Sequence, residues 1–210
     1  MENSLMMSKK AELLRRLQAH SVEKKPFEEA CVILVDRSGS MSDPSGSETK
    51  ISAVKRCIPF LSCPGRYISY SLIGFEDWPT VIVHPTTSFS NIQSGVDFLV
   101  PRGGTNFTQA IREGLKTFLE LKEIPERKRM ILLSDGRHNA EQSELGGMID
   151  KCVEMGVVVD TLGFGADADV DLLREIARRT GGKFQFVDSP LALEHAYRKL
   201  NFTVRWIEHK

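Results

Sequence analysis

The sequence predicts an α/β protein: a three-layer, doubly wound, mostly parallel sheet of six strands, one of them an antiparallel edge strand, flanked by helices. Continuous apolar runs at residues 31–35 and 130–133 are typical of parallel strands buried on both faces. Segments with helical spacing alternate with such runs, and right-handed crossovers then place helices on both faces of the sheet. A chain of 210 residues suffices for one domain with a well-buried core.

The first half of the chain begins with a strand at residues 31–35. Apolar residues at helical spacing predict a helix over residues 50–62, and Pro59 predicts a kink or an early end within it. Residues 68–75 form the next predicted strand. Only a short polar turn separates it from the brief apolar run 81–83, and such a turn cannot join parallel strands. We therefore expect residues 81–83 to lie antiparallel at one edge of the sheet.

The middle of the chain supplies two more helices and a strand. The capping-box pattern at residues 90–93 predicts a helix that starts there and is closed by Pro101. A longer helix follows Thr105, and a strand then ends at Asp135. The residues expected to place the longer helix on the sheet are Phe107, Ile111, Leu115, Phe118 and Leu119.

The last third continues the alternation. An apolar stripe, Leu145, Met148, Ile149 and Cys152, predicts a helix that Gly156 ends. A strand over residues 157–162 precedes a helix that stops at residues 181–182, and the last strand follows at 184–187. Ser189 and Pro190 have the types expected at a helix start. The inward side of this final helix is predicted to carry Leu193, Ala196, Tyr197 and Leu200.

Composition limits the classes of partner. The 28 basic and 28 acidic residues cancel, so no general field attracts nucleic acid or an anionic membrane, and neither partner is expected. No apolar run approaches a membrane span, and the N-terminus lacks the apolar core of a signal peptide, which favours a cytoplasmic location. Four cysteines, at 31, 57, 63 and 152, lack C-x-x-C spacing and are expected to be free thiols.

Three segments are predicted: an N-terminal helical extension at 1–26, a single α/β domain at 27–204 and a tail at 205–210. The extension contains a short helical pattern at 11–17 and an excess of basic residues. Two interpretations stay open for it. The helix binds a partner, or it packs on the domain or frays in solvent.

Oxygen-bearing side chains follow two of the predicted strands. Asp36, Ser38 and Ser40 stand at i, i+2 and i+4 after the first strand, so all three oxygens can point into one small volume. Asp135 follows the second apolar run, and Thr105 lies in a glycine-rich loop. The carboxyl ends of strands are where open α/β sheets bind ligands. Hard oxygens gathered in this way favour Mg²⁺ or Mn²⁺ over zinc.

This order of residues resembles the von Willebrand factor A domain and its metal-ion-dependent adhesion site, with the pattern D-x-S-x-S, then Thr, then Asp. The matching positions are Asp36, Ser38, Ser40, Thr105 and Asp135, and the resemblance covers roughly residues 28–204. It implies a Rossmann-like fold of the intracellular prokaryotic type. It also implies that Ser38 and Ser40 bind the metal directly, while the other three bind it directly or through water.

The resemblance further implies a function in protein binding rather than catalysis. The metal would bridge to an Asp or Glu of a partner protein, in a scaffold or adaptor that works beside AAA ATPases or in kinase and phosphatase signalling. Elementary electrostatics agrees, because two neighbouring carboxylates repel unless a cation lies between them. An octahedral Mg²⁺ would keep one exchangeable position for the partner's carboxylate.

Six residues are predicted to form a partner-binding rim around the metal: Arg37, Met41, Gly104, Asn106, Gly136 and His138. Arg37 is either a rim cation that steers acidic partners or a solvated charge, and His138 is either near the metal or merely solvated. Trp78 is either an exposed contact or packed over the edge strand. A further acidic group, Asp167, Asp169 and Asp171, is interpreted as helix N-terminal acids rather than as a calcium loop.

The alternative function is a Mg²⁺-dependent hydrolase or phosphatase with Asp36 as nucleophile. That chemistry needs a general acid about two residues further on, where the chain has Ser38. A glycine-rich phosphate loop with a lysine does not follow any predicted strand. The sequence leaves open the partner, the choice between Mg²⁺ and Mn²⁺, and the oligomeric state.

Overall fold

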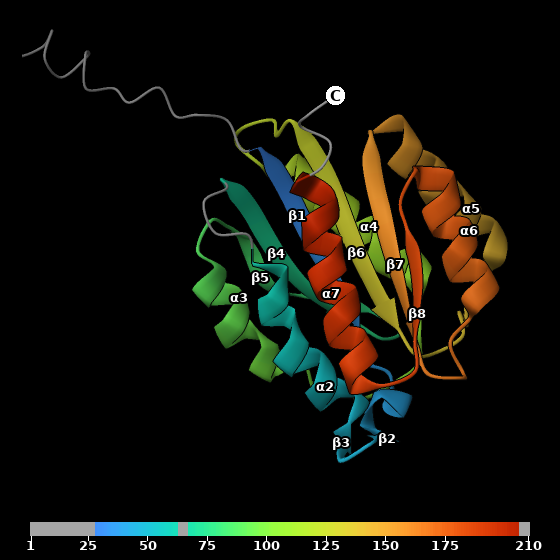
Figure 1. Cartoon of the computed structure of the whole chain (residues 1–210). Helices are drawn as coiled ribbons and strands as arrows, with labels where there is room; N and C mark the ends of the chain where they lie inside the picture. Colours follow the sequence, from blue (N-terminus) through green and yellow to red (C-terminus); the bar gives the residue numbers. More distant parts are fainter. Residues whose placement is uncertain (1–27, 63–66, 206–210) are drawn as a thin grey trace, which may run out of the picture.

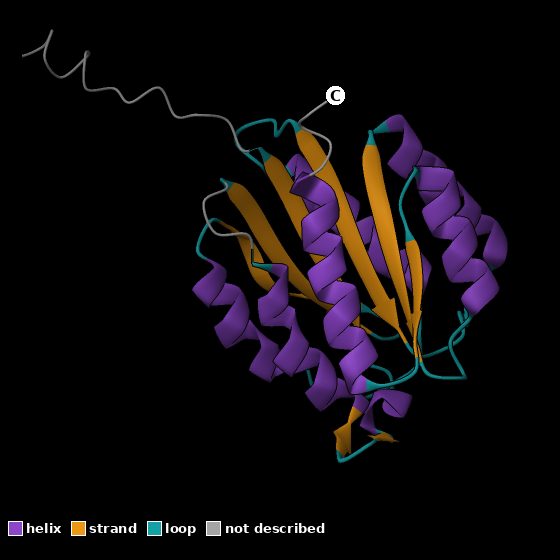
Figure 2. Ribbon diagram, viewed as in Figure 1, coloured by secondary structure: helices purple, strands orange, loops and turns teal. Residues whose placement is uncertain are grey.

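The computed structural model describes residues 28–62 and 67–205, which form a six-stranded sheet between two layers of helices (Figures 1 and 2). The strand order is β5-β4-β1-β6-β7-β8. Only β5 runs antiparallel to its neighbour, and it lies at the edge. The predicted fold class is therefore confirmed. The strands are β1 (Glu29–Asp36), β4 (Ile68–Phe75), β5 (Pro79–Thr86), β6 (Arg127–Ser134), β7 (Val157–Phe164) and β8 (Phe184–Val187).

Helices cover both faces of the sheet. One face carries α2 (Lys50–Cys57), α3 (Phe89–Gly95) and α7 (Pro190–Arg205), and the other carries α4 (Phe107–Leu119), α5 (Gln142–Glu154) and α6 (Val170–Thr180). Short 3-10 helices in the described part are η1 (Gly39–Ser42), η2 (Ile58–Leu61) and η3 (Val96–Phe98), and a small hairpin is formed by β2 (Pro44–Ser45) and β3 (Glu48–Thr49).

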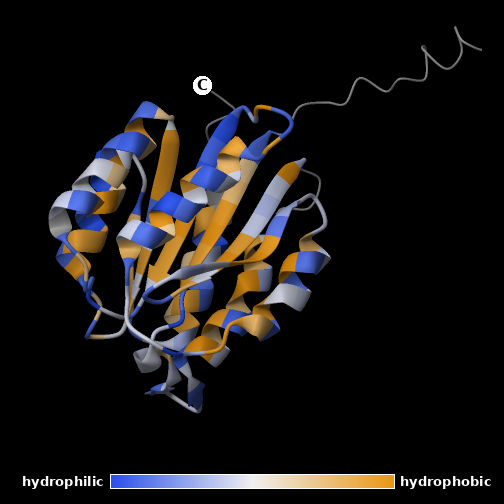
Figure 3. Ribbon diagram, turned by 180° about the vertical axis from the view of Figure 1, so that it is seen from behind, coloured by the Kyte–Doolittle hydropathy of each residue, from blue (hydrophilic) through white to orange (hydrophobic). Residues whose placement is uncertain are grey.

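The central strand β1 shows why its sequence is apolar without alternation. Successive side chains of a strand point to opposite faces. Cys31, Ile33 and Val35 accordingly pack under α2 and α7, while the residues between them face α4 and α5. Because helices cover both faces, every position must be apolar. Figure 3 shows this as hydrophobic colour along the central strands.

Several local details differ from the sequence prediction. Helix α2 ends at Cys57, before the 3-10 turn that contains Pro59, so the predicted early end is confirmed. Helix α3 starts at Phe89 with Ser88 at its N-cap, not at residue 90. The following 3-10 turn ends at Phe98, three residues before the proline expected to close it. Leu119 is 74% exposed because it is the last residue of α4 and points away from the sheet.

Other predictions are confirmed or lie outside the described residues. The apolar stripes predicted for α5 and α7 are buried, and Ser189 accepts a hydrogen bond from Ala192 N–H at the start of α7. Cys31, Cys57 and Cys152 are buried free thiols. The extension 1–26, Cys63 and residues 206–210 of the predicted tail fall outside the described part. Within the described part, helices long and apolar enough to span a membrane are absent.

Candidate metal centre

The parallel pairing of β1 with β6 brings two acids to the carboxyl edge of the sheet, the lower edge in Figure 1. Asp36 ends β1, and Asp135 directly follows β6. Both carboxylates are fully buried. Thr105 reaches the same edge from the loop before α4, where a hydrogen bond of 3.1 Å from Gly39 N–H to the Gly103 carbonyl joins the two loops. Three segments distant in sequence therefore meet there.

The two serines are placed by the short 3-10 helix η1. Met41 N–H donates to the Ser38 carbonyl over 3.0 Å, which turns the chain back on itself. The hydroxyls of Ser38 and Ser40 lie 3.1 Å apart. Ser40 Oγ is 2.9 Å from Asp135 Oδ1, and Ser38 Oγ is 3.5 Å from the same oxygen. The tight turn thus aims both hydroxyls at one oxygen of Asp135.

Asp36 is held from three sides. It accepts hydrogen bonds from Ser38 N–H over 2.7 Å, from Thr105 Oγ1 over 3.4 Å and from Ser134 Oγ. Burial raises the pKa of Asp36 from 3.8 to about 6, against the hydrogen bonds from Ser134 and Ser38, which lower it. The charge of Asp135 adds to the increase. Ionising Asp36 is therefore costly unless a cation compensates its charge.

Lys50 belongs to this cluster, and sequence reasoning missed it. The residue opens α2, and its Nζ lies 2.6 Å from Asp135 Oδ2. A second carboxylate, Asp43, is 3.9 Å from the same nitrogen. One feature of the sequence could have indicated this contact of Lys50. A lysine in the first turn of a helix opposes the macrodipole, so its presence there indicates an acidic partner nearby.

The residues present fit a divalent cation of the magnesium type. All five predicted ligands converge, and they offer two carboxylates and three hydroxyls, which are hard oxygen donors. Lys50 approaches only Oδ2 of Asp135, so Oδ1 keeps its place beside the serines. Clusters of three or more His, Cys, Asp or Glu side chains that could hold a metal ion are absent from the described ranges, so the candidate centre depends on its hydroxyl oxygens as well as its two carboxylates.

Comparison with known proteins identifies the family. Residues 31–138 match the model of the von Willebrand factor type A domain. The chain belongs to the von Willebrand factor type A (vWA) family. It is 28% identical over 179 residues to an uncharacterised protein of Synechocystis sp., a match that covers 81% of this chain and 40% of the relative.

Solved structures show the same vWA fold. A von Willebrand factor type A protein from Catenulispora acidiphila has a TM-score of 0.71 at 23% identity, over 83% of this chain and 42% of that one. An aerotolerance-related membrane protein from Bacteroides fragilis has a TM-score of 0.72 at 16% identity, and the match covers 84% of this chain and 98% of that one. The vWF domain of the type V pili tip protein Mfa5 from Porphyromonas gingivalis has a TM-score of 0.69 at 11% identity, and the match covers 89% of this chain and 98% of that one. This chain spans less than half the length of the Synechocystis and Catenulispora relatives.

Two of the residues predicted to form the partner-binding rim, Met41 and Arg37, are buried in this vWA domain instead. Met41 is fully buried in the core under α2, because the 3-10 turn that exposes Ser40 points the next side chain inward. Arg37 is 5% exposed, and its Nη2 lies 3.0 Å from Glu76 Oε1 and 2.6 Å from Thr80 Oγ1. Burial lowers the pKa of Arg37. Both interpretations of Arg37, the steering cation and the solvated charge, are therefore wrong, and its role in this domain is to tie β1 to the β4–β5 turn.

Gly104, Asn106 and Gly136 lie next to Thr105 or Asp135 in the chain, at the candidate metal centre, and are partly exposed. Gly104 N–H donates to Asp77 Oδ2 over 3.1 Å, which ties the Thr105 loop to the β4–β5 turn. Asn106 accepts from Gln109 N–H over 3.1 Å and so caps α4. These contacts hold Thr105 in place, and they leave backbone rather than bulky side chains beside the hydroxyl cluster.

His138 is half-buried and has a structural contact. Its Nδ1 accepts a hydrogen bond of 3.2 Å from Phe107 N–H, and its ring stacks on Phe107 with centroids 5.4 Å apart. Burial lowers the pKa of His138, which keeps the ring neutral so that it can accept this bond. Neither predicted role fully describes it, since the histidine completes the start of α4 rather than standing free in solvent.

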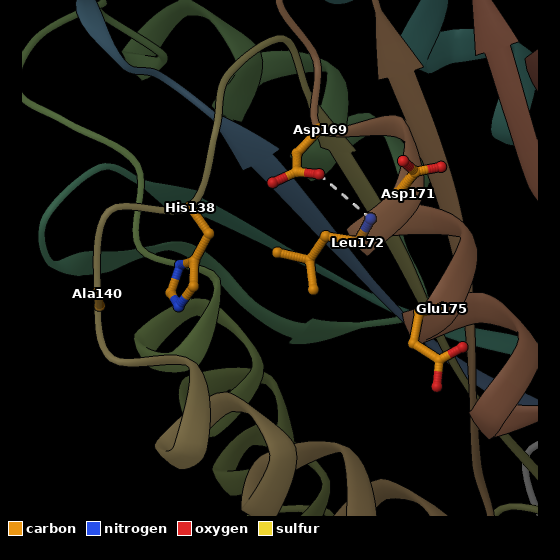
Figure 4. A pocket seen from close by; sticks show the side chains of 6 residues that line it. All are labelled: His138, Ala140, Asp169, Asp171, Leu172 and Glu175. Atoms are coloured by element: carbon orange, nitrogen blue, oxygen red, sulfur yellow. Dashed lines mark hydrogen bonds between the residues drawn. The ribbon is translucent and has the colours of Figure 1, made fainter.

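A hollow of about 350 Å³ lies next to the loop that follows Asp135 (Figure 4). It is bounded by the His138 loop and the first turns of α6, which are joined by a 3.3 Å hydrogen bond from Asp169 N–H to the Gly136 carbonyl. Asp169 caps α6 by accepting from Leu172 N–H over 3.2 Å, and Asp171 lies in the first turn. The interpretation of these two acids as helix N-terminal residues is confirmed.

Trp78 lies in the β4–β5 turn at the same edge of the sheet and is 68% exposed. Its neighbour Asp77 contacts the Gly104 loop, so the turn that carries Trp78 lies against the loop before Thr105. Of the two predicted positions for Trp78, the exposed one is observed. Phe98 and Val100 are also exposed, at 70% and 59%, in the segment that leads back to the Gly103 loop.

Proposed function

We propose that this vWA domain is a metal-dependent protein-binding module, in which Mg²⁺ or Mn²⁺ bridges the domain to an aspartate or glutamate of a partner protein. The observation that carries the proposal is the convergence of Asp36, Ser38, Ser40, Thr105 and Asp135 at one edge of the sheet. When bound, the metal would supply a Lewis-acid contact for a carboxylate oxygen of the partner.

Each part of the site has a separate task in this proposal. Asp36 and Asp135 supply negative charge, and the hydroxyls supply neutral oxygens, so the metal keeps positive charge for an acidic ligand. Ser40 and Gly136 are partly exposed, which gives a partner access from solvent. Trp78, exposed in the β4–β5 turn at the same edge of the sheet, offers an apolar contact. The site is thus suited to hold a protein surface that presents one acid.

Membership of the vWA family supports the binding function, because vWA domains are generally interaction modules. We extend this to a scaffold or adaptor in the cytoplasm, with AAA ATPases or with kinases and phosphatases as partners. The free thiols at Cys31, Cys57 and Cys152 are consistent with a reducing compartment. Neutral net charge argues against nucleic acid as the partner.

The geometry disfavours the alternative, in which Asp36 is the nucleophile of a Mg²⁺-dependent hydrolase. Asp36 is fully buried, and hydrogen bonds from Ser38, Thr105 and Ser134 hold its carboxylate in place. The phosphorus of a substrate would have to reach an Asp36 oxygen in line with the leaving group, and a fully buried carboxylate does not offer that approach. A test on generic phosphoesters with Mg²⁺ should therefore show no turnover, and Asp36-dependent turnover would replace the binding function with the hydrolase.

The test measures metal binding and partner capture together. The full chain, its Asp36→Ala variant and the matched control Asp167→Ala, an exposed acid in the β7–α6 loop, are titrated with Mg²⁺ and Mn²⁺ by calorimetry. The same three proteins are used to capture partners from lysate, with Mg²⁺ and with chelator. We expect metal binding and a chelator-sensitive partner set for the wild type and for Asp167→Ala, and neither for Asp36→Ala. Partners that are indifferent to chelation and to Asp36→Ala would refute the proposal.

A further inference from the structure

The buried ammonium of Lys50 is a feature that the proposed function does not use. Its Nζ contacts Asp135 Oδ2 at 2.6 Å, while the serine hydroxyls face Oδ1 of the same carboxylate. The lysine side chain is 10% exposed. One carboxylate is therefore shared between a fixed internal cation on one side and the predicted metal position on the other.

The surroundings of Lys50 keep its ammonium in this position. Gly165 packs along the lysine stem, since a Cβ added there would lie 3.6 Å from Lys50 Cε. Besides Asp135, Asp43 lies 3.9 Å from Nζ, and the Asp43 side chain is 59% exposed. A charge this enclosed differs from a surface ion pair, which solvent screens. Its field acts on the metal centre directly.

Counting charges shows what Lys50 does to the site. Asp36 and Asp135 as carboxylates, with Lys50 as ammonium, leave the buried centre with one negative charge, while solvent screens the charge of the exposed Asp43 side chain. A divalent cation makes the loaded centre positive by one, and a ligand carboxylate then brings it to neutrality. Without Lys50, the loaded centre would already be neutral, and a carboxylate would make it negative.

We infer that Lys50 is a built-in counter-charge that weakens binding of the metal alone and strengthens binding of an acidic ligand to the loaded site. This inference rests on the proposed function. By linkage, a ligand that binds more tightly to the loaded site also raises the affinity for the metal by the same factor. Because Lys50 tightens the binding of the carboxylate to the loaded site, a given concentration of acidic ligand raises the metal affinity more when Lys50 is present. It is a positioning and specificity residue, because it acts through Asp135 and not by touching the ligand.

The test replaces the charge of Lys50 in the full chain. Lys50→Met removes both the charge and the hydrogen bond, whereas Lys50→Gln keeps an N–H donor for Asp135 and removes only the charge. Lys55→Met is the matched control, because it makes the same change later on α2, where Lys55 Nζ contacts only the exposed Asp97 carbonyl at 3.3 Å among the hydrogen bonds and ion pairs given for the described residues. Mn²⁺ is titrated by calorimetry without and with acetate as the carboxylate probe, and thermal melting in chelator checks folding.

We expect Lys50→Met and Lys50→Gln to bind Mn²⁺ alone more tightly than the wild type by about tenfold or more, which corresponds to about 1.4 kcal/mol or more. A given concentration of acetate should raise the Mn²⁺ affinity of the wild type and of Lys55→Met, and it should raise that of the two Lys50 variants by a smaller factor. In chelator, both Lys50 variants should melt at a lower temperature than Lys55→Met, since the buried Asp135 then lacks the counter-charge of Lys50.

The outcomes separate this inference from the proposed function. Wild-type binding of Mn²⁺ that Asp36→Ala abolishes, together with unchanged affinity in Lys50→Gln, would overturn the inference and leave the proposed function standing. Mn²⁺ binding by Lys50→Met but not by the wild type would support the counter-charge and overturn the proposed function for the native chain. Absence of Mn²⁺ binding in every protein would overturn both.

Discussion

Replacing Asp36 by asparagine should stabilise the metal-free protein at neutral pH. The carboxylate is fully buried, and burial raises its pKa from 3.8 to about 6. At about 1.4 kcal/mol per pKa unit, this difference corresponds to roughly 3 kcal/mol of unfavourable ionisation in the folded state. Asparagine has nearly the same shape and carries no charge. Its carbonyl oxygen can accept from Ser38 N–H, and its amide N–H₂ can donate to the hydroxyl oxygens of Thr105 and Ser134.

The sign of the pH dependence follows from the raised pKa of Asp36. A group whose pKa is higher in the folded state contributes stability that is complete below its unfolded pKa and is lost as the pH rises through its folded pKa. In chelator, the free energy of unfolding of Asp36→Asn minus that of the wild type should therefore be close to its minimum below pH 3.8. It should grow by roughly 3 kcal/mol once the pH exceeds about 6.

The assay is urea unfolding in chelator across this pH range, with the difference between the two proteins taken at each pH so that other titrating groups cancel. Asp171→Asn, whose side chain is 96% exposed, controls for the substitution itself. With Mg²⁺ present, the advantage of Asp36→Asn over the wild type in the free energy of unfolding should shrink or change sign. The reason is that a ligand at a hundred times its Kd stabilises the protein that binds it by about 2.7 kcal/mol. A difference that stays constant with pH, or a wild type that is more stable than Asp36→Asn in chelator at neutral pH, would refute the reasoning.

Three further changes have expected outcomes. Tyr197→Phe removes a fully buried hydroxyl without a hydrogen-bond partner among the described residues, so it should leave stability unchanged or raise it by about 1 kcal/mol in urea unfolding, and a loss would reveal a missed partner. Arg129→Met leaves the buried Asp160 without the ion pair it makes at 2.6 Å and should cost about 3–5 kcal/mol, most of which the double variant with Asp160→Leu should restore. Trp78→Ala, at an exposed position, should change stability by less than about 0.5 kcal/mol and still weaken chelator-sensitive partner capture; equal capture would exclude the indole from the interface.

The strands and the identity of the acids at their ends follow from local sequence. A strand covered on both faces must be apolar at every position, so residues 31–35 and 130–133 stand out in the sequence. Once both strands are assigned to a parallel sheet, their carboxyl ends share an edge, and Asp36 and Asp135 must meet there. The observed contacts of Ser38 and Ser40 with Asp135 follow the same logic.

Side-chain direction in loops and at helix ends did not follow from local sequence. Met41 follows Ser40 directly, yet the 3-10 turn buries one and exposes the other. Leu119 fits the apolar pattern of α4, but it lies on the last turn, past the edge of the sheet. Local sequence predicts a surface charge at Arg37, but in the folded domain its guanidinium is buried because it pairs with Glu76 of the β4–β5 turn.

The sequence alone determined the α/β class, the edge at which the site is built and the chemistry of its five oxygen donors, because these depend on periodicity and on residue type. Only the tertiary structure decided that Lys50 joins Asp135 and that Arg37 is withdrawn from the surface. Both depend on pairs of charges that are distant along the chain. Such pairs form because an enclosed charge must find a partner, and only the packing of the whole domain determines which partner is within reach.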